Sequence, residues 1–323
     1  PFIKWAVEPA RAQDVPGAIA RAYHIAMTPP CGPVFVPIPI DDWDQMCDPP
    51  AFTRMSSTQY PDPAALAEVA EMLSAARKPV FVVGAQVSLD DGWDDVIALA
   101  EQHKAGVWVA PMNARVSFPE NHPLFMGFLS AFREQIVGCL DGADLVLVLG
   151  GPAFTYHAEG FGPHVPEGAK LVQLTNDPNM ASWIPEGRAI IGNVKAGIAA
   201  LLAGRAPAER TAPSPREMPA ALPGNPLTDA YLMQRLAALR PSNSVIVEEA
   251  ASSRGAMHDH LPITARDGFY TCASGGLGHG LPAAIGVALA RPEERVIALL
   301  GDGASMYAIQ GLWTAARLNL PIT

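Results

Sequence analysis

The chain has 323 residues, of which 49% are hydrophobic and 17% are charged, so it has enough apolar residues for buried cores and too little charge for intrinsic disorder. Its 22 basic and 32 acidic residues give a net charge of −10, which argues against nucleic acid or an anionic membrane as a partner. The 4 cysteines lack metal-site or disulfide-framework spacing, and no apolar run approaches the roughly 20 residues of a membrane-spanning helix. We therefore expect a cytoplasmic enzyme that acts on a small molecule.

Prolines divide the chain into three blocks. The segment 206–226 is rich in proline and poor in large apolar residues, which predicts an extended, solvated connector. A weaker boundary covers residues 49–63. We therefore predict blocks at residues 1–48, 64–205 and 227–323, joined by these two linkers.

Helices and strands are predicted to alternate along the chain. In the first block a helix at 15–27 precedes a strand at 34–38. The middle block is predicted to contain helices at 64–76, 93–103, 131–140 and 194–202, and strands at 79–83, 107–110, 145–149 and 170–175. The last block is predicted to contain helices at 229–239, 282–290 and 305–318, and strands at 244–247 and 295–300. This alternation predicts an α/β fold with a parallel sheet covered on both faces.

The last predicted strand ends in Gly301-Asp302-Gly303 and passes into a helix. Ligands of open α/β sheets bind at such strand ends, where glycines let the backbone approach them closely. The unpaired N–H groups of the following helix suit a phosphate, and Asp302 offers an oxygen ligand for Mg²⁺. The alternative is a tight turn in which Asp302 only caps the helix.

A second glycine-rich passage from strand to helix lies upstream, with glycines at 275, 276, 278 and 280 before Pro282. It lacks the G-x-G-x-x-G spacing and the ribose-binding acid of a dinucleotide fingerprint. Two glycine-lined strand ends in one block favour a bulky diphosphate cofactor. Leu277 is either an apolar support for that cofactor or a core residue.

Motifs along essentially the whole chain resemble the thiamine diphosphate-dependent 2-oxo-acid decarboxylases, and within them the benzoylformate decarboxylases. The Gly-Asp-Gly and Gly-Gly-Leu-Gly motifs mark this cofactor class in general, whereas Asp41-Asp42-Trp43-Asp44, the Trp-Val-Ala-Pro motif at 108–111 and Tyr156-His157 point to the benzoylformate branch. Further matching motifs are Lys4-Trp5 with Glu8-Pro9, Gly32-Pro33-Val34, the segment 281–286 and the segment 312–316.

The resemblance implies a Rossmann-like middle domain at 64–205 and a partial diphosphate-binding α/β domain at 227–323. Residues 1–48 would be the C-terminal remnant of a pyrimidine-binding domain. The family's catalytic glutamate would precede this chain, and an Asn-Asn pair that completes the Mg²⁺ site would follow it. We therefore expect a piece of a longer parent that is inactive alone, the parent being a homo-oligomer, a dimer or tetramer, with the cofactor between subunits.

The resemblance also implies thiamine diphosphate and Mg²⁺ as cofactors and assigns roles to residues. Leu277 would hold the cofactor bent, the Gly275 carbonyl would accept its amino group, Asp302 would bind Mg²⁺ and His157 would act as acid and base. The remaining cofactor-binding residues would be Gly276, Gly301, Gly303, Ala304 and Ser305. Relatives often place serine directly after Gly-Asp-Gly, so the hydroxyl that reaches the diphosphate stays open.

Other polar residues have competing interpretations. A lone histidine is usually structural, but His157 follows a strand at the edge of the sheet where ligands bind. His258 and His260 would face different sides of a helix and form no metal pair. Glu249 resembles a family glutamate that contacts either the cofactor or nearby loops. The segment from Glu248 to Arg254 replaces a stretch rich in serine and threonine.

The implied reaction is non-oxidative decarboxylation of an aromatic 2-oxo acid, such as benzoylformate, to an aldehyde and CO₂. One alternative is a carboligase similar to acetolactate synthase, which tight FAD binding in the middle domain would reveal. Another is a non-catalytic domain pair that serves assembly.

Overall fold

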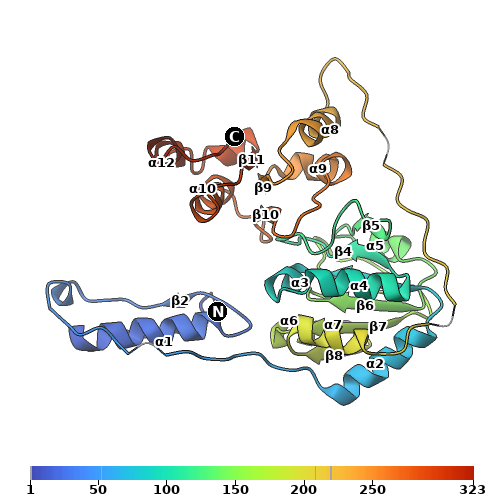
Figure 1. Cartoon of the computed structure of the whole chain (residues 1–323), viewed down its shortest axis with the longest axis horizontal. Coiled ribbons are helices and arrows are strands. Elements are labelled where there is room, and N and C mark those ends of the chain that lie inside the picture. The colour runs from blue at the N-terminus through green and yellow to red at the C-terminus, as the bar shows by residue number, and fades with distance from the viewer. Residues whose placement is uncertain (1, 52, 208, 219) are drawn as a thin grey trace.

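The computed structural model describes residues 2–51, 53–207, 209–218 and 220–323 (Figure 1). The linker predictions at 49–63 and 206–226 therefore include Phe52, Ala208 and Pro219, which lie outside the described residues. The described residues form three sheets of two, six and three strands, in which every strand pair is parallel. This confirms the predicted α/β fold.

The N-terminal segment holds helix α1 (Val15–Met27) and a small sheet of β1 (Trp5–Ala6) and β2 (Val34–Phe35). Strand β2 ends earlier than predicted because Pro37 has no N–H group to donate to a neighbouring strand. Figure 1 shows this segment standing apart from the other two sheets, joined to them by extended chain.

The six-stranded unit has the strand order β5-β4-β3-β6-β7-β8. Its strands are β3 (Pro79–Val83), β4 (Gly106–Val109), β5 (Phe125–Phe128), β6 (Leu145–Leu149), β7 (Lys170–Thr175) and β8 (Arg188–Ile191). Its helices are α2 (Pro63–Ala75), α3 (Ala85–Leu89), α4 (Trp93–His103), α5 (Arg133–Cys139), α6 (Pro178–Ser182) and α7 (Val194–Leu202).

Helices cover both faces of this sheet, which is why its central strands are apolar throughout. Phe81 and Val83 pack with α2, α4 and α7 in one core cluster, whereas Val80 and Val82 pack with α5 in another. Alternate side chains of β3 therefore serve opposite layers.

The three-stranded unit has β9 (Val245–Glu249) between β10 (Phe269–Thr271) and β11 (Val296–Leu300). Its helices are α8 (Asp229–Leu239), α9 (Arg254–His260), α10 (Gly280–Ala290), α11 (Asp302–Ser305) and α12 (Gly311–Arg317). The single helix predicted at 305–318 is therefore wrong, since the structure has two helices with turns between them. Gly311 packs against α10, where an added Cβ would lie 3.1 Å from Ile285 Cδ1.

The six-stranded and three-stranded units share a core and a buried carboxylate. Trp93 and Val116 of the first unit pack into the core cluster of the second. The Glu120 carboxylate accepts hydrogen bonds from the Ile263 N–H at 2.8 Å and from the His258 ring at 3.2 Å. These contacts fix the second unit on the first.

The connector between these units is extended, but it is not solvated throughout as predicted. Arg210 is buried because its guanidinium donates hydrogen bonds to the carbonyls of Leu73 and His103, which lie in the last turns of α2 and α4. Arg216 pairs with Asp259 of α9. Beyond these anchors, residues 222–228 are exposed.

Limited proteolysis tests the predicted boundary, which remains a prediction. With subtilisin we expect the first cuts within residues 222–228, where exposed backbone has no helix or strand to protect it. Arg210→Ala should extend cleavage toward residue 210, whereas Arg266→Ala, which alters an exposed ion pair, should not. First cuts within 79–202, mapped by mass spectrometry, would contradict the boundary.

His103 predicts how stability depends on pH. It is 1% exposed, and both ring nitrogens lack a hydrogen-bond partner. Burial, and then the charge of Arg210, lowers the pKa of His103 from 6.5 to about 4. The unfolded chain therefore gains a proton on acidification before the folded chain does, and the free energy of unfolding should fall by about 3 kcal/mol between these two pKa values. Urea denaturation across this window should show a flatter profile for His103→Phe, and an unchanged profile would refute the assignment.

Candidate functional site

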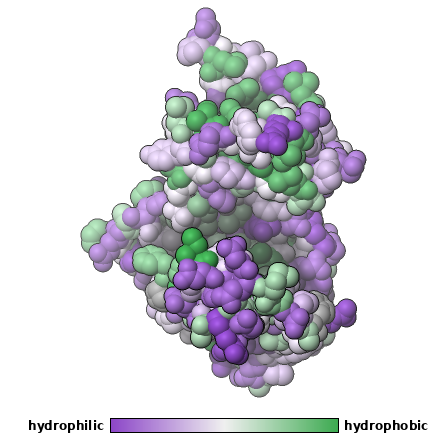
Figure 2. All heavy atoms as spheres, turned by 90° about the vertical axis from the view of Figure 1, so that its left-hand side faces the viewer, coloured by the Kyte–Doolittle hydropathy of each residue, from purple (hydrophilic) through white to green (hydrophobic). Residues whose placement is uncertain are grey.

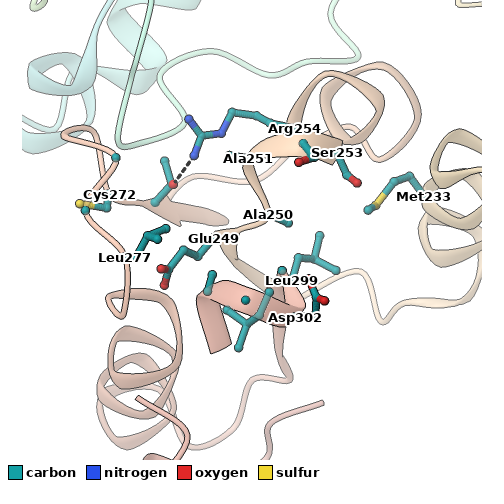
Figure 3. Close-up of a pocket in the computed structure, with 18 of the residues that line it drawn as sticks. Met233, Glu249, Ala250, Ala251, Ser253, Arg254, Cys272, Leu277, Leu299 and Asp302 are labelled. Atoms are coloured by element: carbon teal, nitrogen blue, oxygen red, sulfur yellow. Dashed lines mark hydrogen bonds between the residues drawn. The ribbon is translucent and has the colours of Figure 1, made fainter. Parts of the chain in front are cut away.

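The carboxyl ends of β9, β10 and β11 meet beside a cavity of about 520 Å³ (Figure 3). Its walls come from the segment after β9, the loop after β10 and the Gly-Asp-Gly turn after β11. The carboxyl edge of a parallel sheet is where ligands bind in α/β proteins. This cavity is therefore the candidate cofactor site.

Most residues predicted to bind the cofactor line this cavity. They are Gly275, Gly276, Leu277, Gly301, Asp302, Gly303 and Ala304. Ser305 is not part of the lining, and its hydroxyl donates a hydrogen bond to the backbone carbonyl of Asp302 at 2.7 Å. The structure thus brings together two loops that are separated by about two dozen residues in the sequence.

The carboxylate of Asp302, in the Gly-Asp-Gly turn, receives no hydrogen bond from the described residues. Gly301 is the N-cap of α11 and Asp302 is the first helical residue, without a side-chain capping bond. The alternative that Asp302 caps the helix is therefore wrong. Within the described residues its carboxylate has no hydrogen-bond or ion-pair partner, and an added Cβ at Gly303 would meet open space. The turn therefore offers a carboxylate oxygen to a metal ion, next to backbone at Gly303 that a ligand can approach closely.

Glu249 holds the glycine-rich loop against β9. Its two carboxylate oxygens accept hydrogen bonds from the N–H groups of Gly278 and Gly280, each at 2.5 Å. Gly278 has a φ of +88°, and an added Cβ there would lie 2.9 Å from Tyr307 Cβ. The structure shows the loop contact, and because Glu249 also lines the cavity, its contact with the cofactor stays a prediction.

Glu248 orients the guanidinium of Arg254 on the wall of the cavity. It is 1% exposed, and its carboxylate accepts hydrogen bonds from Arg254 Nε at 2.9 Å and from the Thr271 hydroxyl at 2.8 Å. Figure 3 shows the further bond from Arg254 to Thr271. Among the described lining residues Arg254 is the only basic one. Sequence reasoning noted this segment but missed the role of Arg254, whose signal was an acid and a base six residues apart after a strand.

Cys272 begins the glycine-rich loop and borders the same cavity. The hydrogen bond with Ser274 lowers the pKa of the Cys272 thiol, and the backbone N–H groups of Gly276 and Gly275 add to this effect against the opposing effect of burial. The cavity therefore contains a thiol whose reactivity can report on ligand binding.

His157 lies outside the cofactor cavity. Its backbone N–H donates to the Ala131 carbonyl at 3.0 Å, and its ring lies 6.3 Å from that of Phe132. The neighbouring Ser130 lines a second cavity of about 320 Å³, and the two cavities share Arg254 and Thr271. His157 itself is exposed and lines neither cavity.

The donor set near Asp302 fits a magnesium ion bound mainly by a cofactor. In the described part of the chain, no group of three or more histidine, cysteine, aspartate or glutamate side chains is arranged to hold a metal. Mg²⁺ commonly uses one or two carboxylates together with phosphate oxygens and water. Asp302 supplies one such carboxylate.

Comparisons with known proteins identify the family of this chain. The central domain of thiamine pyrophosphate enzymes matches residues 66–201, and their C-terminal TPP binding domain matches residues 249–323. The chain belongs to the thiamine pyrophosphate enzymes. This confirms the resemblance stated from the motifs. No helix in the described residues has the length and apolar character needed to cross a membrane.

Individual relatives cover nearly all of this chain. Benzoylformate decarboxylase from Pseudomonas aeruginosa is 39% identical over 99% of this chain and 62% of its own length. Acetolactate synthase isozyme 1 large subunit from Escherichia coli is 28% identical over 96% of this chain and 57% of its own. The chain thus spans less than two thirds of the length of these relatives.

Solved structures give the same picture. A putative thiamin diphosphate-dependent enzyme from Mycobacterium smegmatis has a TM-score of 0.95 and 37% identity, covering 100% of this chain and 64% of that chain. Benzoylformate decarboxylase from Polynucleobacter necessarius has a TM-score of 0.94 and 37% identity, covering 100% of this chain and 62% of that chain.

Alkylation of Cys272 tests whether thiamine diphosphate occupies the cofactor cavity. With Mg²⁺ and the cofactor at ten times its Kd, Cys272 should react with iodoacetamide roughly tenfold more slowly, because mass action leaves few cavities empty. Cys31 and Cys47, which are exposed elsewhere, should react equally with and without cofactor. Asp302→Asn should remove the protection, as measured by peptide mass spectrometry. Equal rates at Cys272 in the wild type would show that the cofactor does not bind there.

Proposed function

We propose that the whole protein carrying this chain is a decarboxylase that uses thiamine diphosphate and Mg²⁺. Its substrate would be an aromatic 2-oxo acid of the benzoylformate type, which it converts to an aldehyde and CO₂. The observation that carries the proposal is the cavity that unites the glycine-rich loop, Leu277 and the free carboxylate of Asp302. The similarity to benzoylformate decarboxylases over the full chain supports the reaction class.

The bound cofactor supplies a carbon nucleophile and accepts the electron pair that CO₂ leaves behind. The residues of the chain position it. Leu277, which is 55% exposed, would contact the cofactor and hold it bent. The Gly275 carbonyl would accept a hydrogen bond from the amino group of the cofactor. Asp302 would bind Mg²⁺, and the backbone at Gly276, Gly301, Gly303 and Ala304 would leave room for the diphosphate. Ser305 would act through its bond to the Asp302 carbonyl.

His157 would move the proton in this reaction. The similarity to benzoylformate decarboxylase supports this role, since His157 lines neither cavity and only its backbone contact with Ala131 ties it to the neighbour of the lining residue Ser130. A histidine is suited to both proton donation and acceptance near neutral pH.

A homo-oligomer, a dimer or tetramer, is part of the proposal. Exposed apolar side chains follow the Gly-Asp-Gly turn at Met306, Tyr307, Leu312 and Trp313. Figure 2 shows hydrophobic residues in green among hydrophilic ones on the upper part of the face it presents. Apolar residues gathered in this way support association between copies.

A cytoplasmic location is proposed because all 4 cysteines are free thiols.

A carboligase similar to acetolactate synthase is the second candidate, favoured by relatives of that name over 96% of this chain. Flavin absorbance in the purified protein would support it. A non-catalytic domain pair serving assembly would instead show no cofactor-dependent turnover.

Substitution of His157 tests the proposed reaction. In the whole protein with cofactor and Mg²⁺, His157→Ala should lower kcat for benzoylformate by roughly 10²–10⁴-fold, the usual effect of losing a positioned acid or base. Thiamine diphosphate affinity should not change. His260→Ala, which alters a histidine with no proposed role in the reaction, serves as the control in a coupled aldehyde assay. Full turnover with a lower Tm would identify His157 as a packing residue.

A further inference from the structure

The second cavity lies between the two larger units of the molecule. It is lined by residues at the ends of β4 and β5, by α9 and by Arg216 of the connector. Its volume of about 320 Å³ is within the range of small-molecule sites. The cavity is separate from the cofactor cavity except for the shared wall of Arg254 and Thr271.

Two polar groups of the lining residues have no partner within the described part of the chain. Arg216 Nη1 and Ser130 Oγ are buried and form no hydrogen bond. Buried donors without an acceptor are rare in folded proteins because they lose their bonds to water. Arg216 Nη1 can only donate and the Ser130 hydroxyl is able to donate, so one acceptor group could serve both.

The protein holds the Arg216 guanidinium firmly in place. Its other terminal nitrogen pairs with Asp259 of α9. Its Cζ lies beside Gly127 of β5, where an added Cβ would be only 3.5 Å away. A guanidinium fixed on two sides is preorganised for a carboxylate, which it binds more strongly than it binds a neutral acceptor.

Charge in the cavity does not oppose an anion. Asp259 is paired with Arg216, and the charge of Arg254 is paired with Glu248 outside the cavity lining. His258 faces the cavity with its ring bonded to Glu120. The Arg216 nitrogen and the Ser130 hydroxyl therefore remain able to donate hydrogen bonds to an anion.

Apolar and aromatic residues form another part of the lining. Phe128 stacks on His258 with ring centroids 3.6 Å apart, and Phe269 meets the same ring edge-on at 5.3 Å. Met112 and Leu129 add an adaptable apolar surface. A cavity of roughly 150 Å³ suffices for benzene, so this one has room for an aromatic ring and an acid group.

We propose that this cavity binds a small aromatic carboxylate, with its acid group on Arg216 and Ser130 and its ring against Phe128 and Phe269. The site does not depend on the proposed decarboxylation. The same chemistry is available from two sources, namely the substrate of the enzyme or an effector that is not consumed.

Benzoate is a suitable probe because it has no keto carbon and cannot react. We expect isothermal titration of the whole protein, saturated with thiamine diphosphate and Mg²⁺, to detect benzoate binding. Arg216→Met should raise the benzoate Kd roughly 10- to 100-fold, the effect of losing a charged hydrogen bond. Arg266→Met, which removes another paired arginine outside the cavity, should leave the Kd unchanged.

A second pair of variants avoids any loss of the Arg216–Asp259 contact. Gly255 lines the cavity from α9, and an added Cβ there meets no atom within 4 Å, so Gly255→Leu should fold and obstruct the site. Gly286→Leu makes the same change in α10, outside the cavity, with equally open space. Benzoate binding should be lost only in Gly255→Leu.

Failure of benzoate to bind the wild type, or equal Kd values in the cavity variants and their controls, would overturn the proposal. Inhibition kinetics then separate the sources. Competition with benzoylformate would identify a substrate pocket, whereas a change in kcat alone would identify an effector pocket, and both support the site. If the protein does not turn over benzoylformate at all, the proposed function fails while the titration still decides the site.

Discussion

The buried carboxylate of Glu120 is the contact that holds the two larger units together and so forms the second cavity between them. Placing a carboxylate in a protein interior is costly unless hydrogen bonds replace its water. Glu120 obtains them from the Ile263 N–H and from His258, both in the three-stranded unit, and the Glu120 N–H returns a bond to the Ile263 carbonyl at 3.0 Å. These bonds position α9, and α9 with β10 forms one wall of the second cavity.

A second carboxylate organises the cofactor cavity in the same manner. Glu249 ends the central strand and binds the two N–H groups of the glycine-rich loop, so the loop is held before any ligand arrives. Its neighbour Glu248 orients Arg254 in the opposite direction, toward the wall that the two cavities share. Adjacent residues of a strand point to opposite faces, so Glu249 holds the glycine-rich loop while Glu248 holds Arg254. Preorganisation of this kind lowers the cost of ordering a site when its ligand binds.

Much of the fold and of the cofactor site could be predicted because the relevant signals are local. The strands Pro79–Val83 and Leu145–Leu149 have the predicted bounds, since each is a continuous apolar run buried on both faces. Strand β5 was missed because Gly127, with a φ of +124°, interrupts its pattern, and its register with β4 shifts nearby. The Gly-Asp-Gly turn and the glycine-rich loop were recognisable because carboxyl ends of parallel strands share one edge.

The sequence by itself determined the fold class, most of the helices and strands, and the two loops that supply much of the cofactor cavity. Tertiary structure alone decided that Arg210 is buried, that His157 lines neither cavity, and that Arg216 and Ser130, which are far apart in sequence, line the same cavity. The physical reason is the separation along the chain over which each signal acts. Periodicity and turn chemistry act between neighbours, whereas Glu120 and His258 are 138 residues apart and meet only because two packed cores bring them together. No local pattern records such a contact.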